Sequence, residues 1–167
     1  MLVLGIDPGT ATTGYGLIQV NGGSKFEAVE FGLIETSKNG EPHKRLALIE
    51  YELTKIIKMH GPDVMAIEKL FFATNAKTAI RVGQAQGVIL LCAAKTNLPV
   101  FEYAPGSIKK MISGNGRADK KEMQRALRSL LGAGVRSKKH KKTHFDNEAD
   151  ALAVALCHVY TSVARLR

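Results

Sequence analysis

The hydrophobic residues of this 167-residue chain follow two different periods, which together predict an α/β protein. Short apolar runs bounded by turn residues predict five strands, at residues 2–6, 15–20, 26–34, 63–68 and 99–103. Apolar residues at helical spacing predict four helices, at residues 46–57, 75–95, 119–131 and 149–163. Short links containing glycine join the first three strands, so we expect these strands to form an antiparallel meander.

Local signals mark several helix ends. Asn75 is a candidate N-cap for the second helix, and Asp119 with Glu122 has the sequence of a capping box. Gly83 and Gly87 share one face of the second helix, which would let a neighbouring segment approach closely. The order of elements predicts one domain over residues 1–167, with a five-stranded mixed sheet and helices on both faces.

Charge and composition narrow the class of partner. The chain has 24 Lys and Arg against 15 Asp and Glu, and a net charge of +9 favours a polyanion such as nucleic acid. A basic protein without such a partner is the alternative. Cys92 and Cys157 lie in apolar helical stretches without a CxxC pattern, which predicts reduced, buried thiols in a cytoplasmic protein. No signal peptide or membrane span is expected from the sequence.

Two acidic residues stand at the ends of apolar strands. Asp7 follows the first strand and Glu68 ends the fourth. These strands are expected to be neighbours, so the two carboxylates would lie side by side and repel each other unless a cation sits between them. Phosphodiester hydrolysis by divalent ions needs such converging acidic oxygens, which favours a metal site. The alternatives are a local Asp-Pro-Gly turn at Asp7 and an exposed strand exit at Glu68.

A third carboxylate, Asp150, lies in the last predicted helix between apolar neighbours. Asp146 and Asn147 precede it by about one turn, so either could share its face. Asp146, Asn147 and Glu148 are equally explained as helix caps or as acids that suit the helix dipole. Asp150 is harder to explain in that way because of its apolar surroundings.

Aromatic and basic residues beside the acids are candidates for nucleic-acid contact. Phe71 and Phe72 follow Glu68 in a loop, where one ring could stack on a base, although core packing of a ring is the ordinary alternative. A first basic group comprises Lys109, Lys110, Arg117, Lys120 and Lys121, and a second run covers residues 136–142. Both could follow phosphates, and a solvated charged surface is the alternative.

Four ordered segments resemble the RuvC-type Holliday junction resolvases. They are Gly5-Ile6-Asp7-Pro8-Gly9-Thr10, residues 66–87 from Ala66-Ile67-Glu68 onward, Tyr103-Ala104-Pro105, and the last helix from Asp150 to His158. The resemblance implies a ribonuclease H-like fold and a homodimer. It also implies symmetric nicking of two strands of like polarity at a four-way DNA junction, in recombination and DNA repair.

The resemblance further implies roles for individual residues. One or two Mg²⁺ ions per subunit, for which Mn²⁺ can substitute, would be bound by Asp7, Glu68 and Asp150. The family has a fourth ligand, usually Asp and sometimes His, three residues before the last Asp. That position is Asn147 here, with Asp146 beside it, so both stay candidate metal and catalytic ligands. Base contact is implied at the position of Phe71, and phosphate contacts at the positions of Lys109 and Lys120.

The resemblance also implies a bacterial cytoplasmic protein that works with a RuvAB-like branch-migration complex. Three other functions remain to be weighed. A ribosomal RNA-processing nuclease of the same fold would share the opening motif, and a non-catalytic junction-binding protein would account for Asn147. An actin-like ATPase also places an acidic phosphate loop after its first strand, but it needs two such domains and a longer chain.

Overall fold

The computed structural model describes residues 1–22, 25–70, 76–132 and 145–164, with the side chains at 145, 146, 163 and 164 also outside the description. Five strands form one mixed sheet in the order β3-β2-β1-β4-β5. Strands β1 (Leu2–Asp7), β2 (Thr12–Val20) and β3 (Phe26–Glu35) pair antiparallel, which confirms the predicted meander. Strands β4 (Val64–Glu68) and β5 (Val100–Tyr103) continue the sheet parallel to β1.

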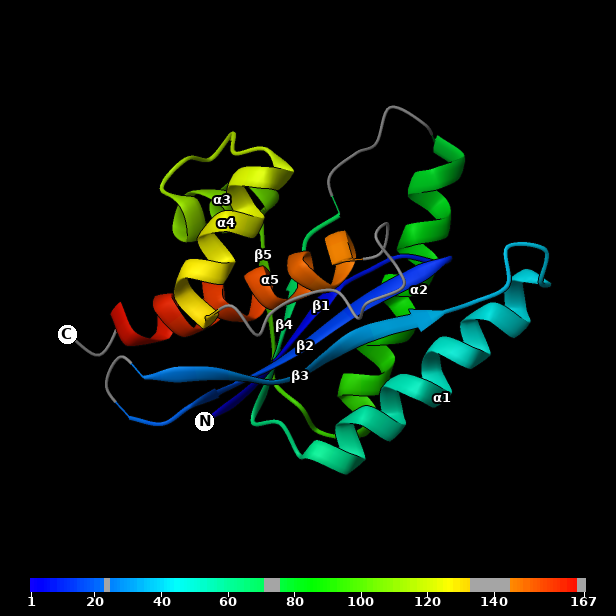
Figure 1. Ribbon diagram of the computed structural model, residues 1–167. Helices are drawn as coiled ribbons and strands as arrows, with labels where there is room; N and C mark the ends of the chain where they lie inside the picture. The colour runs from blue at the N-terminus through cyan, green and yellow to red at the C-terminus, as the bar shows by residue number, and fades with distance from the viewer. Residues whose placement is uncertain (23–24, 71–75, 133–144, 165–167) are drawn as a thin grey trace.

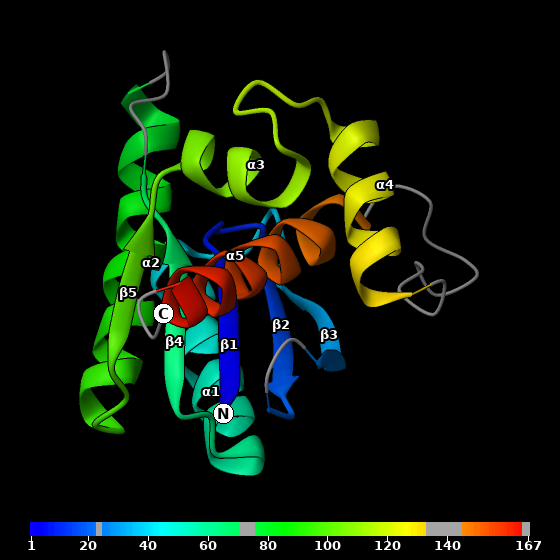
Figure 2. The same cartoon turned by 90° about the vertical axis from the view of Figure 1, so that its left-hand side faces the viewer.

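Helices cover both faces of this sheet, as predicted (Figure 1 and Figure 2). Helices α1 (Pro42–His60) and α2 (Ala76–Lys95) lie on one face. Helix α5 (Phe145–Ala164) crosses the other face and is itself overlaid by α3 (Pro105–Ser113) and α4 (Lys120–Leu131). None of the described helices combines the length and apolar character needed to cross a bilayer.

Alternation along β1 explains why its sequence is an unbroken apolar run. Leu4 and Ile6 belong to the core beneath α1 and α2, whereas Val3 belongs to the core around α5. A strand with helices on both faces needs apolar residues at every position. Every second side chain of a strand points to the same face, so Asp7 is directed toward the α5 face, as Val3 and Gly5 are.

Helix α5 lies unusually close to the sheet because glycines stand beneath it. A Cβ atom on Gly5 would lie 2.1 Å from the carbonyl oxygen of Ala151, and one on Gly14 would lie 2.1 Å from that of Asn147. Both distances are shorter than any real contact, so only glycine permits this approach. The first turns of α5, including Asp150, are thereby held against the ends of β1 and β2.

One helix was not predicted, and three elements begin earlier than predicted. Helix α3 opens with the turn signal Pro105-Gly106 and buries only Ile108 and Ile112, too few residues to show a helical period. Strand β2 and helices α1 and α5 begin three or four residues before their apolar patterns, α1 with Pro42 in its first turn. The Asn75 cap and the basic run at 136–142 lie outside the described residues.

Candidate active site

Three carboxylates from distant parts of the chain come together at the carboxyl ends of the parallel strands β1 and β4. Asp7 and Glu68 are the last residues of β1 and β4, which pair in parallel up to Ile6 and Ile67. Glu68 follows Val64 and Ala66 in the alternation and both of these belong to the core around α5, so Glu68 is directed to the same face as Asp7. Asp150, in the second turn of α5, lies over this edge.

The charges of these carboxylates are strongly coupled. Burial raises the pKa of Asp7 to about 8, with further contributions from the charges of Asp150 and Glu68, while Lys120 acts in the opposite direction. Burial and the charge of Asp150 raise the pKa of Glu68 to about 7, against an opposing effect of Lys109. The protein therefore holds three acids where their ionised forms destabilise one another.

A divalent cation fits this set of donors chemically. Among the described residues, no three His, Cys, Asp or Glu side chains are gathered tightly enough to hold an ion in their present positions. The donors are nevertheless carboxylate oxygens, the ligands preferred by hard divalent cations, and two of them end rigid paired strands. A cation between them would turn the mutual repulsion into attraction and draw the carboxylates inward.

Two hollows flank Glu68. One of about 170 Å³ is lined by Glu68 and Asp150 together with Lys109 from α3 and Lys120 from the start of α4. The other, of about 250 Å³, is lined by Asp7, Glu68 and the side of α2 that carries Thr78 and Val82. The three carboxylates thus line two neighbouring hollows that share Glu68, and the hollow on the α3–α4 side also has Lys109 and Lys120 in its wall.

The capping box positions one of these cations. Asp119 Oδ1 accepts a hydrogen bond from the backbone N–H of Glu122, and Glu122 Oε2 accepts one from that of Asp119, both at 2.8 Å. This confirms the predicted box and makes Lys120 the first residue of α4, next to the carboxylates.

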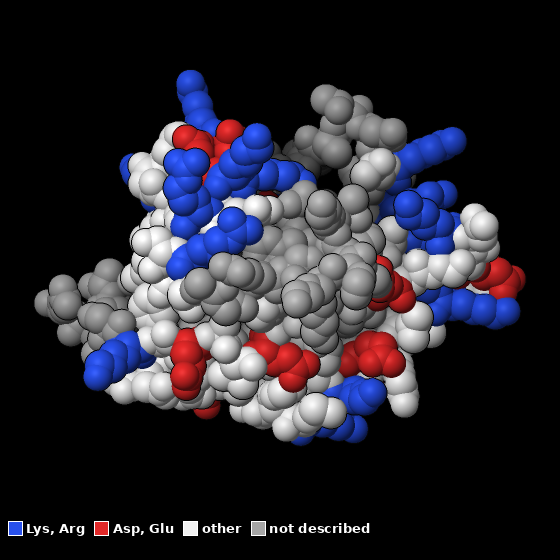
Figure 3. All heavy atoms as spheres, viewed as in Figure 1, with Lys and Arg blue, Asp and Glu red and all other residues white. Residues whose placement is uncertain are grey.

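The other predicted DNA-contacting residues add to the same surface. Lys110, Arg117 and Lys121 are exposed on the α3–α4 side. Figure 3 shows Lys and Arg gathered over α3 and α4 at the upper left. Phe71 and Phe72, which the sequence also suggests as DNA contacts, lie outside the described residues.

The candidate fourth ligand is tied to the sheet. Asn147 Nδ2 donates a hydrogen bond to Thr12 Oγ1 at 2.7 Å, which joins the first turn of α5 to the start of β2. Asn147 carries no charge, so it adds nothing to the repulsion among the three acids. The side chain of Asp146 lies outside the described residues, and the choice between the two positions stays a prediction.

Sequence reasoning missed a buried polar group behind the site. Tyr103 is paired with Glu68 in the sheet, and its hydroxyl lies 2.8 Å from Nδ1 of His158 on α5. The hydroxyl of Ser162 lies 3.1 Å from Nε2 of the same ring. This arrangement ties the edge that carries Glu68 to the helix that carries Asp150. The only sequence signal was a histidine among the apolar residues of the last helix.

Comparisons with known proteins identify one family. The family model described as "Crossover junction endodeoxyribonuclease RuvC" matches residues 3–158. A protein of that name from Caldicellulosiruptor saccharolyticus is 48% identical over 97% of this chain and 94% of its own length. One from Moorella thermoacetica is also 48% identical, over 95% of this chain and 90% of its own.

Solved structures give the same result. The structure described as "T. thermophilus RuvC in complex with Holliday junction substrate" superimposes with a TM-score of 0.87 at 30% identity, covering 99% of this chain and 96% of that one. The yeast mitochondrial Holliday junction resolvase Ydc2 has a TM-score of 0.67 at 13% identity over 99% of this chain and 86% of its own, which supports the shared ribonuclease H-like fold alone. The family model, these relatives and the junction-bound structure together show that this chain belongs to the crossover junction endodeoxyribonuclease RuvC family.

Proposed function

We propose that this protein resolves four-way DNA junctions by nicking two strands of like polarity, in recombination and DNA repair. The observation that carries the proposal is the meeting of Asp7, Glu68 and Asp150 beside two lysines at the carboxyl end of the sheet. Acids alone would repel a phosphodiester. Acids with a bound cation and flanking lysines would attract one and hold it for hydrolysis.

The chain's own residues would divide the work. Asp7, Glu68 and Asp150 would hold one or two Mg²⁺ ions, with Asn147 or Asp146 as a further ligand, and Mn²⁺ could substitute. Bound there, the metal would supply Lewis-acid chemistry that activates water and stabilises the leaving oxygen. Lys109 and Lys120 line the same hollow as Glu68 and Asp150, so they would orient the phosphates on either side of the scissile bond.

Contacts away from the acids would position the junction. Lys110, Arg117 and Lys121 would follow the phosphate backbone without reading base sequence. Phe71 or Phe72 would stack on a base opened at the crossover, where stacking contributes roughly 1–3 kcal/mol.

We infer that the protein acts as a homodimer formed through α2. The second half of this helix carries two exposed apolar residues, Leu90 and Leu91. Gly87 lies one turn before them on the same face, and a Cβ atom there would meet no described atom within 4 Å. A second α2 could therefore pack closely, and a two-fold dimer would present one set of acids to each of two strands of a roughly two-fold junction. A RuvAB-like motor would supply the junctions in the bacterial cytoplasm.

The test is incubation of a strand-labelled synthetic junction with the protein and Mg²⁺. We expect paired nicks at symmetric positions, loss of nicking with EDTA, and little nicking of a linear duplex of the same sequence. Asp7→Asn and Glu68→Gln should bind the junction but not cut it. Cleavage of precursor ribosomal RNA alone would instead indicate an RNA-processing nuclease, and tight binding without nicks in Mg²⁺ or Mn²⁺ would indicate a non-catalytic binding protein.

A further inference from the structure

A second basic hollow lies on the α2 side of the molecule, apart from the lysines of α3 and α4. It has a volume of about 500 Å³ and is formed by the loop after β3, the start of α1 and the first half of α2. Its cationic lining residues come from all three segments: Lys38, Arg45, Lys77 and Arg81. None of the described residues that line it is acidic. We call it the α1–α2 cleft.

One cation of the α1–α2 cleft is fixed in place. Arg45 Nε donates a hydrogen bond to Thr36 Oγ1 at 2.8 Å, and the Thr36 hydroxyl donates to the carbonyl oxygen of Thr10 at 2.5 Å. Thr36 is only 8% exposed, so this chain of bonds is part of the folded framework. A guanidinium held in this way loses little conformational entropy when an anion binds to it. Thr10, which also lines the cleft, stands in the loop that follows Asp7.

Glu41 is the acid between residues 38 and 46, the stretch of chain that supplies Lys38 and Arg45. It forms an ion pair with Lys44, and neither residue is among the described residues that line the α1–α2 cleft. Several like charges facing one hollow repel one another, and an anion that enters relieves this repulsion. Phosphate oxygens suit a fixed guanidinium because they accept its hydrogen bonds in parallel pairs.

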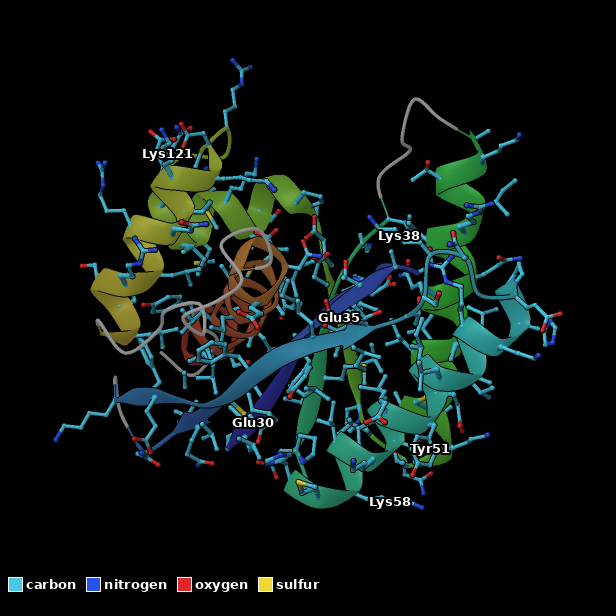
Figure 4. The ribbon with its side chains drawn as sticks, turned by 45° about the vertical axis from the view of Figure 1, so that its right-hand side comes forward. Glu30, Glu35, Lys38, Tyr51, Lys58 and Lys121 are labelled. Atoms are coloured by element: carbon cyan, nitrogen blue, oxygen red, sulfur yellow. The ribbon has the colours of Figure 1, made fainter. Side chains whose placement is uncertain are left out.

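The position of the α1–α2 cleft favours a nucleic-acid backbone as the source of the phosphate. In Figure 4, Lys38 lies beside α2, while Lys121 lies at the start of α4 on the opposite side of the molecule. The carboxyl ends of β1 and β4 lie between these two sides (Figure 1). Figure 3 likewise shows Lys and Arg over α2, separate from those over α3 and α4. DNA that lies across the carboxylates would reach cations on both sides.

We propose that the α1–α2 cleft binds a backbone phosphate of one junction arm, on the opposite side of the carboxylates from Lys109 and Lys120. This inference rests on the proposed function, since it assumes junction DNA at the carboxylates. The cleft would set the direction in which that arm leaves the active site. It would carry no sequence preference, because phosphate contacts do not read bases.

The first test is a pair of charge reversals, Lys38→Glu with Arg81→Glu, compared with Lys58→Glu. Lys58 is exposed at the other end of α1, far from Lys38 (Figure 4). We expect the double variant to bind a four-way junction at least about tenfold more weakly, with a salt-dependence slope smaller by about 1 for each phosphate that the protein no longer neutralises. Lys58→Glu should resemble wild type in affinity, slope and cleavage rate.

A crosslinking experiment provides a second readout that does not depend on affinity. The native cysteines Cys92 and Cys157 are buried, and burial raises the pKa of both thiols, so an introduced cysteine would be the reactive one. Lys38→Cys should crosslink to a junction that carries a thiol-reactive group on a single backbone phosphate, at one or two positions of one arm. Lys58→Cys should not crosslink at any position.

Two results would overturn the inference while leaving the proposed function intact. In the first, wild type binds and cuts the junction, the double variant has the same affinity and salt-dependence slope as wild type, and Lys38→Cys gives no crosslink. The other is loss of the crosslink in millimolar ATP or inorganic phosphate without any loss of junction binding, which would identify a free phosphate compound as the ligand. A wild type that neither binds nor cuts the junction would overturn both.

Discussion

The two halves of α5 hold polar side chains under opposite conditions. In the second half, His158 is 5% exposed and each of its ring nitrogens lies within hydrogen-bonding distance of a hydroxyl, from Tyr103 and Ser162. In the first half, Asp150 raises the pKa of Asp7 and of Glu68. The same helix thus contributes to one polar site whose hydrogen-bonding groups have partners and to another whose like charges repel one another.

This difference separates a structural role from a functional one. A buried polar group with partners on both sides costs the fold little and fixes its packing. Like charges that are partly buried together cost stability. A site that lowers stability without a structural benefit is expected where a ligand or a reaction needs it. The predictions below test whether the two halves of α5 differ in this way.

Removal of one of the opposing charges should have the largest effect. Asp7→Asn keeps the shape of the side chain but removes a charged metal ligand, so we expect cleavage of a four-way junction to fall by about 10³-fold or more, with binding retained. Single-turnover cleavage and gel-shift assays would measure the two effects. Asp63→Asn is the matched control, since Asp63 lies before β4 and its Oδ2 accepts a hydrogen bond from the backbone of Leu2. If both variants cut equally well, Asp7 has no catalytic role.

Displacement of the first half of α5 should have the second-largest effect. In Gly14→Ala the new Cβ would lie 2.1 Å from the carbonyl oxygen of Asn147, so the helix must move away from β2. We expect a loss of about 3 kcal/mol or more in the free energy of unfolding by urea, together with slower cleavage. Gly106→Ala is the control, because its nearest neighbour would be 3.9 Å away. An unchanged urea midpoint for Gly14→Ala would contradict this close packing.

The sequence was sufficient to predict the sheet and the three acids. A strand that is buried on both faces reads as an unbroken apolar run in the sequence. An acid at the end of such a run, as at Asp7 and Glu68, stands out from it. Their proximity followed from the expectation that their strands are neighbours, which the structure confirms by pairing β1 with β4 in parallel. Strands and candidate acids that depend on the pattern within one chain segment could therefore be predicted from the sequence.

The features that sequence reasoning missed depend on contacts between segments. Nothing local indicates that Thr36 lies between Arg45 and the Thr10 carbonyl, or that Tyr103 reaches His158. Helix α3 was missed for a related reason, since a short helix that buries two residues shows no clear period. These contacts form only once the sheet has brought distant residues together.

Removal of the His158 side chain should lower the stability of the fold but leave the Mg²⁺ requirement of cleavage unchanged. His158→Ala leaves a cavity and deprives the Tyr103 and Ser162 hydroxyls of their partner, so we expect a loss of about 2–3 kcal/mol in the free energy of unfolding. The Mg²⁺ concentration that gives half-maximal cleavage should stay within about twofold of wild type. Ser162→Ala, which removes one partner near the surface, should cost about 1 kcal/mol or less. A large shift in the Mg²⁺ requirement of His158→Ala would show that this group acts on the metal site.

The smallest effect is expected in the pH dependence of the metal-free protein. The pKa of Asp7 is raised from 3.8 to about 8 and that of Glu68 from 4.5 to about 7, so the folded state binds these protons more tightly than the unfolded state does. Stability should therefore be highest at low pH with respect to these groups and fall as the pH rises toward 8. Both carboxylates are partly exposed, so solvent screening reduces the effect of these pKa shifts on stability. Urea unfolding in EDTA should show wild type losing roughly 1–2 kcal/mol between pH 6 and 8, and Asp7→Asn losing less. Mg²⁺ at pH 8 should restore the stability of wild type but not of the variant, because a cation compensates the ionised carboxylates. Wild type that gained stability over this range, or an Asp7→Asn variant less stable than wild type at pH 8 without metal, would mean that the acids around the first half of α5 are as well accommodated as His158 in the second.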